Sequence, residues 1–270
     1  MLKSADEIAE KVVQALIDEV ETTPKPGLVD LISNGSHTDL SVPLFYESAC
    51  TLQQFFREFA LLGSSWKGNI SAMFPDVRTL GQEAERAMLL ATGGVNTHKG
   101  ALFSLGILSA VTGFASTHHY EINPSNLCLL TQRMTRFTLE CELAALRHKK
   151  ATTHGELLFA KYGCRGIRGE VMQGFPSVRH YAIPAIKKNS PNNKLLALVS
   201  LMTTTNDSNV LHRGGRDALL GVKATARNLL LNPIDLVPKL ERLDETFVKA
   251  NISSGGCADL LAVTYYLTSI

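Results

Sequence analysis

Glycine, a helix-capping pair and two basic side chains occur together in residues 93–100, which read Gly-Gly-Val-Asn-Thr-His-Lys-Gly. A long run of apolar and small residues follows, from 101 to 114, and is typical of a helix. The Asn-Thr pair suits the N-terminal cap of that helix. Free backbone N–H groups and the positive end of the helix dipole would then lie beside His98 and Lys99. The sequence therefore predicts a phosphate site, although the spacing of a Walker A loop is absent.

Three further segments mix glycine with charged and amide residues between apolar stretches. They are residues 23–39, 164–176 and 206–215. Segments with several ionisable groups gain little from packing, so solvation or a ligand must explain them. The side chains in the four segments that suit an anion are Lys25, Asn96, Thr97, His98, Lys99, Arg168 and Arg213. The carboxylates in or near them are Asp30, Asp39, Glu83 and Asp207.

Taken in order, these segments resemble the motifs of the triphosphoribosyl-dephospho-coenzyme A synthase family. The resemblance covers nearly the whole chain and extends to residues 253–261, where Ser254 replaces an expected proline and Cys257 a small hydroxyl residue. It implies a helical transferase that joins ATP to 3′-dephospho-coenzyme A and releases adenine. The product would be the prosthetic-group precursor of citrate lyase or malonate decarboxylase, passed to the transferase that modifies their acyl carrier protein. The sequence does not distinguish these two users.

The implied reaction sets three chemical tasks: a triphosphate must be held, a ribose hydroxyl activated and the leaving adenine assisted. A triphosphate is usually bound together with Mg²⁺, which takes one or two carboxylates and phosphate oxygens, so the implied cofactor is Mg²⁺. We predict Asp30, Asp39 and Asp207 as its ligands. The predicted catalytic residues are Asp30, His37, Asp39 and Glu83. The side chains that suit an anion are predicted to bind the nucleotide.

Simpler interpretations of the same residues stay open. Asn-Gly and Asp side chains form turns by bonding their own backbone, so residues 30–39 can fold without a ligand. His37 suits a general base or a metal ligand equally well. Asp207 can cap a turn, and Arg213 can pair with Asp217 one helical turn away.

Two other functions fit the same groups. A helical, magnesium-dependent hydrolase of nucleotide or ADP-ribose-like substrates would activate water instead of a ribose hydroxyl. A non-catalytic nucleotide-binding protein would bind ATP without turnover. A hydrolase would release adenine or phosphate without dephospho-coenzyme A, whereas the transferase requires this acceptor.

Composition excludes several classes of protein. The formal net charge is only +2, from 27 Lys and Arg against 25 Asp and Glu, so we expect no non-specific binding of nucleic acid. The five cysteines form no C-x-x-C pair, which argues against a disulfide framework and favours a reducing compartment. No uninterrupted apolar run approaches the ~20 residues of a membrane span, and no apolar signal core is found. We expect a cytoplasmic protein with no membrane partner, and its oligomeric state stays open.

Helical periodicity recurs along the chain and must position the four segments. Ser4 and Glu7 form a capping box ahead of the first pattern, and Thr79 with Gln82 predicts the start of a third helix. An aromatic stripe in residues 44–59 predicts the second. The later predicted helices cover residues 125–148, 153–162, 193–205, 215–232, 235–251 and 256–267. With no convincing strand, we predict an all-α, single multi-helix globular domain over residues 1–270, with glycine-rich functional loops between its helices.

The predicted fourth helix, which begins at Asn96 or Thr97, carries three glycines in its interior: Gly100, Gly106 and Gly113. Each costs ~1 kcal/mol relative to alanine in a helix. We therefore expect close packing against neighbouring helices at these positions.

Overall fold

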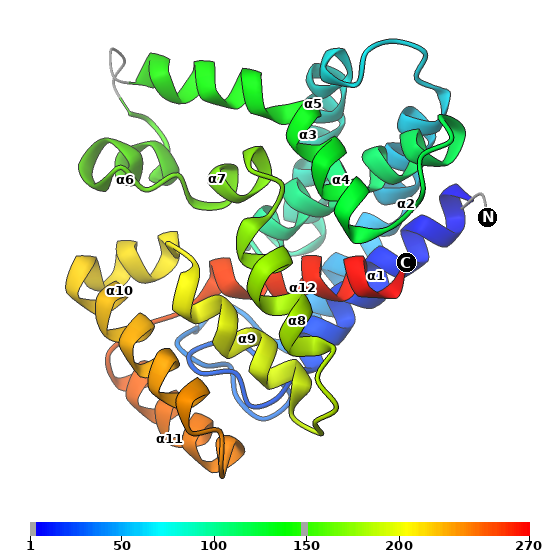
Figure 1. Ribbon diagram of the computed structural model, residues 1–270. Coiled ribbons are helices and arrows are strands. Elements are labelled where there is room, and N and C mark those ends of the chain that lie inside the picture. The colour runs from blue at the N-terminus through cyan, green and yellow to red at the C-terminus, as the bar shows by residue number, and fades with distance from the viewer. Residues whose placement is uncertain (1–3, 147–150) are drawn as a thin grey trace.

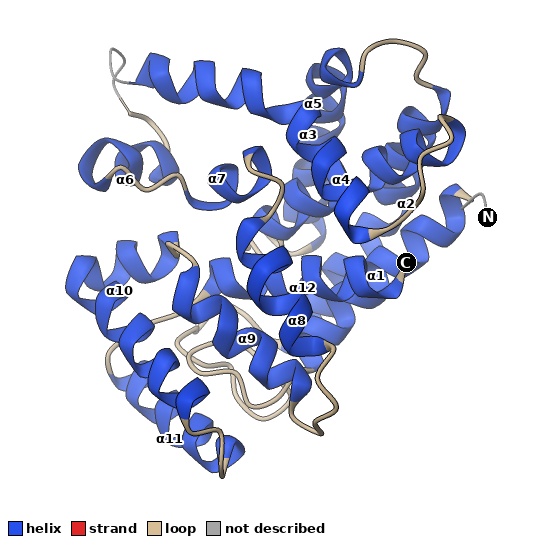
Figure 2. Cartoon of the chain, in the orientation of Figure 1, coloured by secondary structure: helices blue, strands red, loops and turns tan. Residues whose placement is uncertain are grey.

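The computed structural model describes residues 4–146 and 151–270, and within these ranges the chain forms helices and loops with no strand (Figure 1, Figure 2). The all-α prediction is therefore confirmed. The N-terminal half contains α1 (Ala5–Glu21), α2 (Val42–Ser65), the 3-10 turn η1 (Ile70–Met73), α3 (Phe74–Ala91), α4 (Lys99–Thr117) and α5 (Pro124–Ala145). The C-terminal half contains α6 (His154–Tyr162), α7 (Gly166–Met172), the π-helical η3 (Val178–Ala182), α8 (Ile183–Ile186), α9 (Asn193–Thr204), α10 (Ser208–Leu231), α11 (Leu236–Lys249) and α12 (Gly255–Ser269).

Reciprocal capping starts two of the helices as the sequence predicts. The Ser4 hydroxyl accepts the backbone N–H of Glu7 at 3.1 Å, and the Glu7 carboxylate accepts the Ser4 N–H at 2.9 Å. Thr153 and Glu156 form the same capping box at the start of α6. Each box satisfies two N–H groups that the first turn of a helix leaves free.

Three predicted helix starts are wrong. The fourth helix begins at Lys99, after His98, and not at Asn96 or Thr97. The third helix begins at Phe74, with Pro75 in its first turn, and the Thr79 hydroxyl donates to the Pro75 carbonyl inside that helix. Proline is favoured in a first turn because its missing N–H has no partner to lose there. α10 begins at Ser208 instead of residue 215, and Gly215, at φ 73°, interrupts it. The predicted end of the fifth helix near residue 148 lies outside the described residues.

α4 is the buried central helix, and its glycines allow neighbours to approach its backbone. A Cβ at Gly113 would lie 2.1 Å from the Ala60 carbonyl oxygen, and one at Gly106 would lie 2.8 Å from the Phe59 ring. The expected close packing is thus confirmed at these positions, and it is made with α2. α4 is also the one helix of the described ranges that is long and apolar enough to cross a bilayer, but 83% of that stretch is buried inside the molecule.

The C-terminal helix α12 crosses the middle of the molecule, and both ends of the chain lie on the same side (Figure 1). α12 packs on α1, α4 and α9. The loop 22–41 passes beneath the start of α12 beside α11, where the Gly27 N–H donates to the Asp244 carboxylate at 2.7 Å. Its Ser36 hydroxyl donates to the Ile252 carbonyl at 2.6 Å. These contacts hold loop 22–41 against α11 and against the segment that precedes α12.

We predict that Phe56→Ala lowers the free energy of unfolding by ~3–5 kcal/mol, because its fully buried side chain packs in the core between α2 and its neighbours. Phe137→Ala is the control, since that ring is 76% exposed. Thermal melts of both variants test this. Equal melting temperatures would show that the aromatic stripe does not carry the core.

Candidate active site

Two cavities meet at the first turn of α4 and differ in character. The larger is a cleft of about 540 Å³, whose apolar lining includes Phe59, Phe74, Phe103, Ile107, Leu139 and Leu146 and whose rim carries charged side chains. The smaller, about 150 Å³, has a larger share of polar and charged side chains. Lys99 and Gly100 line both cavities. An apolar wall beside a cationic polar pocket suits a ligand with a flat ring at one end and anionic groups at the other.

The polar cavity collects most of the side chains predicted to bind a nucleotide. Those lining it are Lys25, Asn96, Thr97, His98, Lys99 and Arg213. Arg168 lines the neighbouring cleft from α7, a short helix in a segment predicted as loop. The structure thus brings side chains of the four glycine-rich segments to the two adjoining cavities.

His98 lines the polar cavity and is held by a serine. The Thr97 hydroxyl donates to Ser48 Oγ at 2.7 Å, and Ser48 Oγ lies 2.8 Å from His98 Nδ1. Ser48 is free to donate its own proton to Nδ1, and in that arrangement the ring proton is on Nε2. That Nε2 has no partner within the described chain, although the side chain is only 3% exposed. An unpaired buried donor costs ~1–3 kcal/mol, so a ligand oxygen is its natural acceptor.

The charge state of His98 differs from that of an ordinary surface histidine. Complete burial, together with the positive charge of Lys25, lowers the pKa of His98 to about 3. The ring is therefore neutral at physiological pH. It contributes a hydrogen-bond donor to the cavity and no positive charge.

Lys25 lies at the floor of the polar cavity in a buried ion pair. Its Nζ donates to the Glu19 carboxylate and, at 2.7 Å, to the Glu19 carbonyl. Lys25 is 1% exposed and Glu19 4%. Removing one partner would strand a buried charge, so the pair must be retained for the fold.

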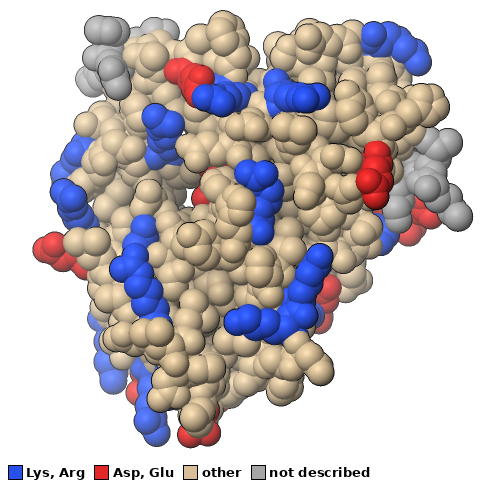
Figure 3. Space-filling model, viewed as in Figure 1, with Lys and Arg blue, Asp and Glu red and all other residues tan. Residues whose placement is uncertain are grey.

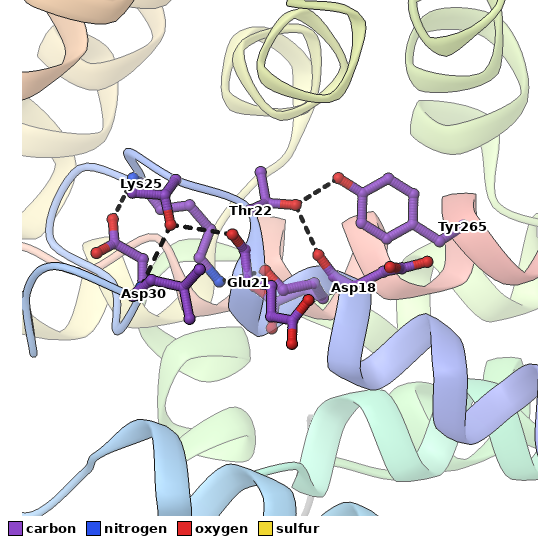
Figure 4. Close-up of polar contacts among 9 residues, drawn as sticks. Asp18, Glu21, Thr22, Lys25, Asp30 and Tyr265 are labelled. Atoms are coloured by element: carbon purple, nitrogen blue, oxygen red, sulfur yellow. Dashed lines mark hydrogen bonds and ion pairs between the residues drawn. The ribbon is translucent and has the colours of Figure 1, made fainter.

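The Asp30 carboxylate is hydrogen-bonded to the backbone of its own loop, and Figure 4 shows its contact with the Lys25 backbone. Its two oxygens accept three backbone N–H groups, those of Lys25, Ile32 and Ser33, at 2.8–2.9 Å. Asp30 is only 4% exposed and lines neither cavity. The structure therefore gives Asp30 the turn-forming role that the sequence left open.

His37 is the one predicted catalytic residue that lines the polar cavity. Arg213 donates to its Nδ1 at 3.3 Å, so Nε2 carries the proton and donates to Ser253 Oγ at 2.9 Å. Burial is the main cause that lowers the pKa of His37, with a further lowering by Arg213 and an opposing effect of Asp39. His37 is thus a neutral residue of loop 22–41 held at both nitrogens, by Arg213 of α10 and by Ser253 before α12.

Asp207 caps α10 instead of facing a ligand. One oxygen accepts the N–H groups of Asn209 and Val210, and the other accepts the Cys257 N–H at 2.9 Å. Burial raises the pKa of this carboxyl, against the lowering effect of those N–H groups. A single side chain thereby joins the starts of α10 and α12.

The predicted magnesium site of Asp30, Asp39 and Asp207 is not formed. Within residues 4–146 and 151–270, no group of three or more His, Cys, Asp or Glu could hold a metal ion. The carboxylate oxygens of Asp30 and Asp207 accept backbone N–H groups, because both side chains are buried and need partners. Asp39 is exposed and lines neither cavity.

Glu83 also lies outside the site, and its neighbour Glu85 lies within it. Glu83 is exposed on α3 and lines neither cavity. Glu85 lines the cleft and forms an ion pair with Lys99. A second pair, Arg78 with Glu142, lines the same cleft. On the face seen in Figure 3, Lys and Arg side chains are spread over the surface and do not join into one patch.

Sequence reasoning missed two carboxyl groups that line the polar cavity, Glu19 and Asp259. Glu19 has no signal of its own, because the polar positions of an amphipathic helix usually face water. Asp259 stands in the glycine-rich tail, residues 253–261, whose resemblance to the family was noted without a role for this residue.

The sequence matches the CitG family, described as ATP:dephospho-CoA triphosphoribosyl transferase, over residues 5–270. The chain belongs to this family. The match confirms the resemblance seen in the glycine-rich segments and the expectation of a transferase.

Individual relatives agree with the family. The probable 2-(5''-triphosphoribosyl)-3'-dephosphocoenzyme-A synthase of Streptococcus pyogenes serotype M18 (strain MGAS8232) is 38% identical over 278 aligned positions. These cover 96% of this chain and 95% of that protein. Proteins of the same name from serotype M5 (strain Manfredo) and serotype M1 show the same identity and coverage. No solved structure matches the chain.

We predict that Asp30→Asn destabilises the protein by ~1–3 kcal/mol, because the amide nitrogen cannot accept the backbone N–H that one carboxylate oxygen accepts now. In a chain of this size that lowers the melting temperature by several degrees. Asp39→Asn is the control, since Asp39 is exposed. An Asp30→Asn protein with an unchanged melting temperature and no activity would return Asp30 to the catalytic residues.

We predict that Lys99→Ala weakens binding of inorganic tripolyphosphate roughly ten- to a hundred-fold, the effect of losing a charge-assisted contact at a helix start. Calorimetric titration measures the affinity. Lys249→Ala is matched to it, because Lys249 also pairs with a glutamate, Glu245, but is 80% exposed at the end of α11. Equal affinities for both variants would remove the phosphate site from the start of α4.

Proposed function

We propose that the protein catalyses transfer of the triphosphoribosyl group of ATP to 3′-dephospho-coenzyme A, with release of adenine. Membership of the CitG family and the name shared by the relatives support this activity. The observation that carries it is the meeting of an aromatic-lined cleft and a polar, cationic cavity at the first turn of α4. A nucleoside triphosphate has matching parts, a flat base and a polyanion joined by the sugar.

The chain's own groups divide the work between the two cavities. The positive end of the α4 dipole, the Lys99 ammonium and the neutral His98 ring would take triphosphate oxygens. The apolar walls of the cleft, with the partly exposed Phe103 among them, would hold the base. The ribose would then lie at Gly100, where the cavities join. Its C–N bond must break through an oxocarbenium-like state, as in glycoside chemistry.

Mg²⁺ remains part of this proposal in a different form from that predicted. A cation carried by the triphosphate needs only one or two carboxylates from the protein. Glu85 fits this need, because it lines the cleft and its present partner, Lys99, would turn to the phosphates. When bound, the ion would neutralise phosphate charge during the reaction.

The further context is proposed on the family alone. The product would pass to a transferase that modifies an acyl carrier protein, in the cytoplasm, for citrate lyase or malonate decarboxylase. The residues of this chain favour neither of these two users.

The test is mass analysis of ATP and 3′-dephospho-coenzyme A incubated with the protein and Mg²⁺. We expect a product that retains all three phosphates and an equal amount of free adenine. Stoichiometric pyrophosphate or AMP would contradict the proposal. Adenine or phosphate released in the absence of dephospho-coenzyme A would indicate a hydrolase instead.

Chelation gives a separate prediction. Excess EDTA should abolish turnover, because the polyanion would otherwise lie beside Glu85 and Glu19 without a divalent cation to offset their charge. Adding Mg²⁺ back should restore the rate. Full activity in excess EDTA would remove the metal from the proposal.

A further inference from the structure

Asp259 of α12 places its carboxyl group against the first turn of α4. A Cβ at position 100 would lie 2.0 Å from Asp259 Oδ2, so only glycine leaves room for this contact. The backbone N–H of Ala101 donates to the same carboxyl. Gly100 lines both cavities, and Asp259 lines the polar one. The carboxyl therefore lies at the junction of the cavities.

The charged groups that act on Asp259 are acidic, and the nearby basic side chains are bound to other partners. Glu19 of α1 and Asp207 at the start of α10 are the acidic groups that act on it. Within the described ranges no Lys or Arg forms an ion pair with it, and the cations of the polar cavity have other partners. Lys25 is bound to Glu19, and Lys99 to Glu85.

The remaining basic groups of the cavity are occupied as well. Arg213 donates to the Ser36 carbonyl, to the Asn251 side chain and to His37. His98 is neutral. Burial, with the repulsion of Glu19 and Asp207, raises the pKa of Asp259 to about 8, although the Ala101 N–H opposes the shift. Asp259 thus holds a proton at neutral pH.

We propose that Asp259 is the general acid that protonates the departing adenine. This rests on the proposed function, in which the base occupies the aromatic cleft and the triphosphate the polar cavity. With the nucleotide so placed, its C–N bond lies over Gly100, which the Asp259 carboxyl touches. No other carboxyl that lines the polar cavity is free, since Glu19 is bound to Lys25.

The step balances as follows. The acceptor hydroxyl oxygen forms a bond to the anomeric carbon of the ATP ribose and gives its proton to solvent. The C–N bond breaks, and its electron pair stays on the adenine ring. The Asp259 proton goes to an adenine nitrogen, so adenine leaves as a neutral molecule. The carboxylate regains a proton from solvent.

Asp259→Asn is the test, because the amide keeps the shape of the side chain but has no proton to give. The expected loss in kcat is roughly 10²- to 10⁴-fold, the usual contribution of general acid catalysis. The wild-type rate should fall as pH rises through about 8, where the acid form is lost, and the variant should lack this alkaline limb. Asp217→Asn, at an exposed position of α10 outside both cavities, is the matched control.

A substrate analogue separates proton donation from other roles. An ATP analogue whose base is 8-azaadenine, a better leaving group, needs less protonation, so the loss in Asp259→Asn should be much smaller with it than with ATP. Asp259→Ser, which also removes the acid, should behave in the same way. Melting temperatures check that the variants fold. Removal of a buried acid should leave the Asn variant at least as stable as the wild type at pH 8.

Three results overturn the proposal. One is an equal loss with both bases, and another is an unchanged alkaline limb. The third is recovery of the Asn variant at higher Mg²⁺, which would make Asp259 a metal ligand. A wild-type protein that forms no triphosphoribosyl product would instead refute the proposed function, so the two failures are distinguishable.

Discussion

The burial of α4 is the constraint on which the rest of the structure depends. Its residues from Ala101 to Ser116 lie almost entirely inside the protein, so its first turn opens into the interior instead of into water. The free N–H groups of that turn need acceptors there. Asn96 Oδ1 takes the N–H of Lys99 at 3.1 Å, and Asp259 takes that of Ala101. The chain therefore supplies acceptors of its own to this turn, and the positive end of the helix dipole still faces the cavity beside it.

The need to pair buried polar groups also explains why several acidic residues do not face a ligand in this cavity. A buried carboxylate must be paired or hydrogen-bonded, and backbone N–H groups are the nearest donors. Asp30 closes loop 22–41 in this way, and Asp207 ties α10 to α12. Asp30 and Asp207 contribute to the site by holding its elements in position. They fix the loop and the helix starts that carry His37 and Arg213 to the polar cavity.

Charge balance within the polar cavity sets the protonation of its members. Lys25 and Glu19 are bound to each other, and the charge of Lys25 lowers the pKa of His98 while that of Glu19 raises the pKa of Asp259. Desolvation then favours the neutral form of both groups, which means an uncharged imidazole donor and a carboxylic acid. A site of this kind keeps its positive charge at Lys99 and the helix start, where a polyanion would bind. It keeps its acid where a sugar-base bond would lie.

The sequence by itself determined the helical class, most helix positions and the four segments that meet at the site. Periodicity and capping are local, so they can be read along the chain, as Ser4 and Glu7 show. Only the tertiary structure decided which carboxylates face a cavity. Asp30 and Asp259 are the same residue type. The Asp30 carboxylate is enclosed by its own loop, whereas the Asp259 carboxyl, carried by α12, contacts the first turn of α4. Burial and partners depend on contacts far apart in the chain, and these set both the geometry and the pKa of each group.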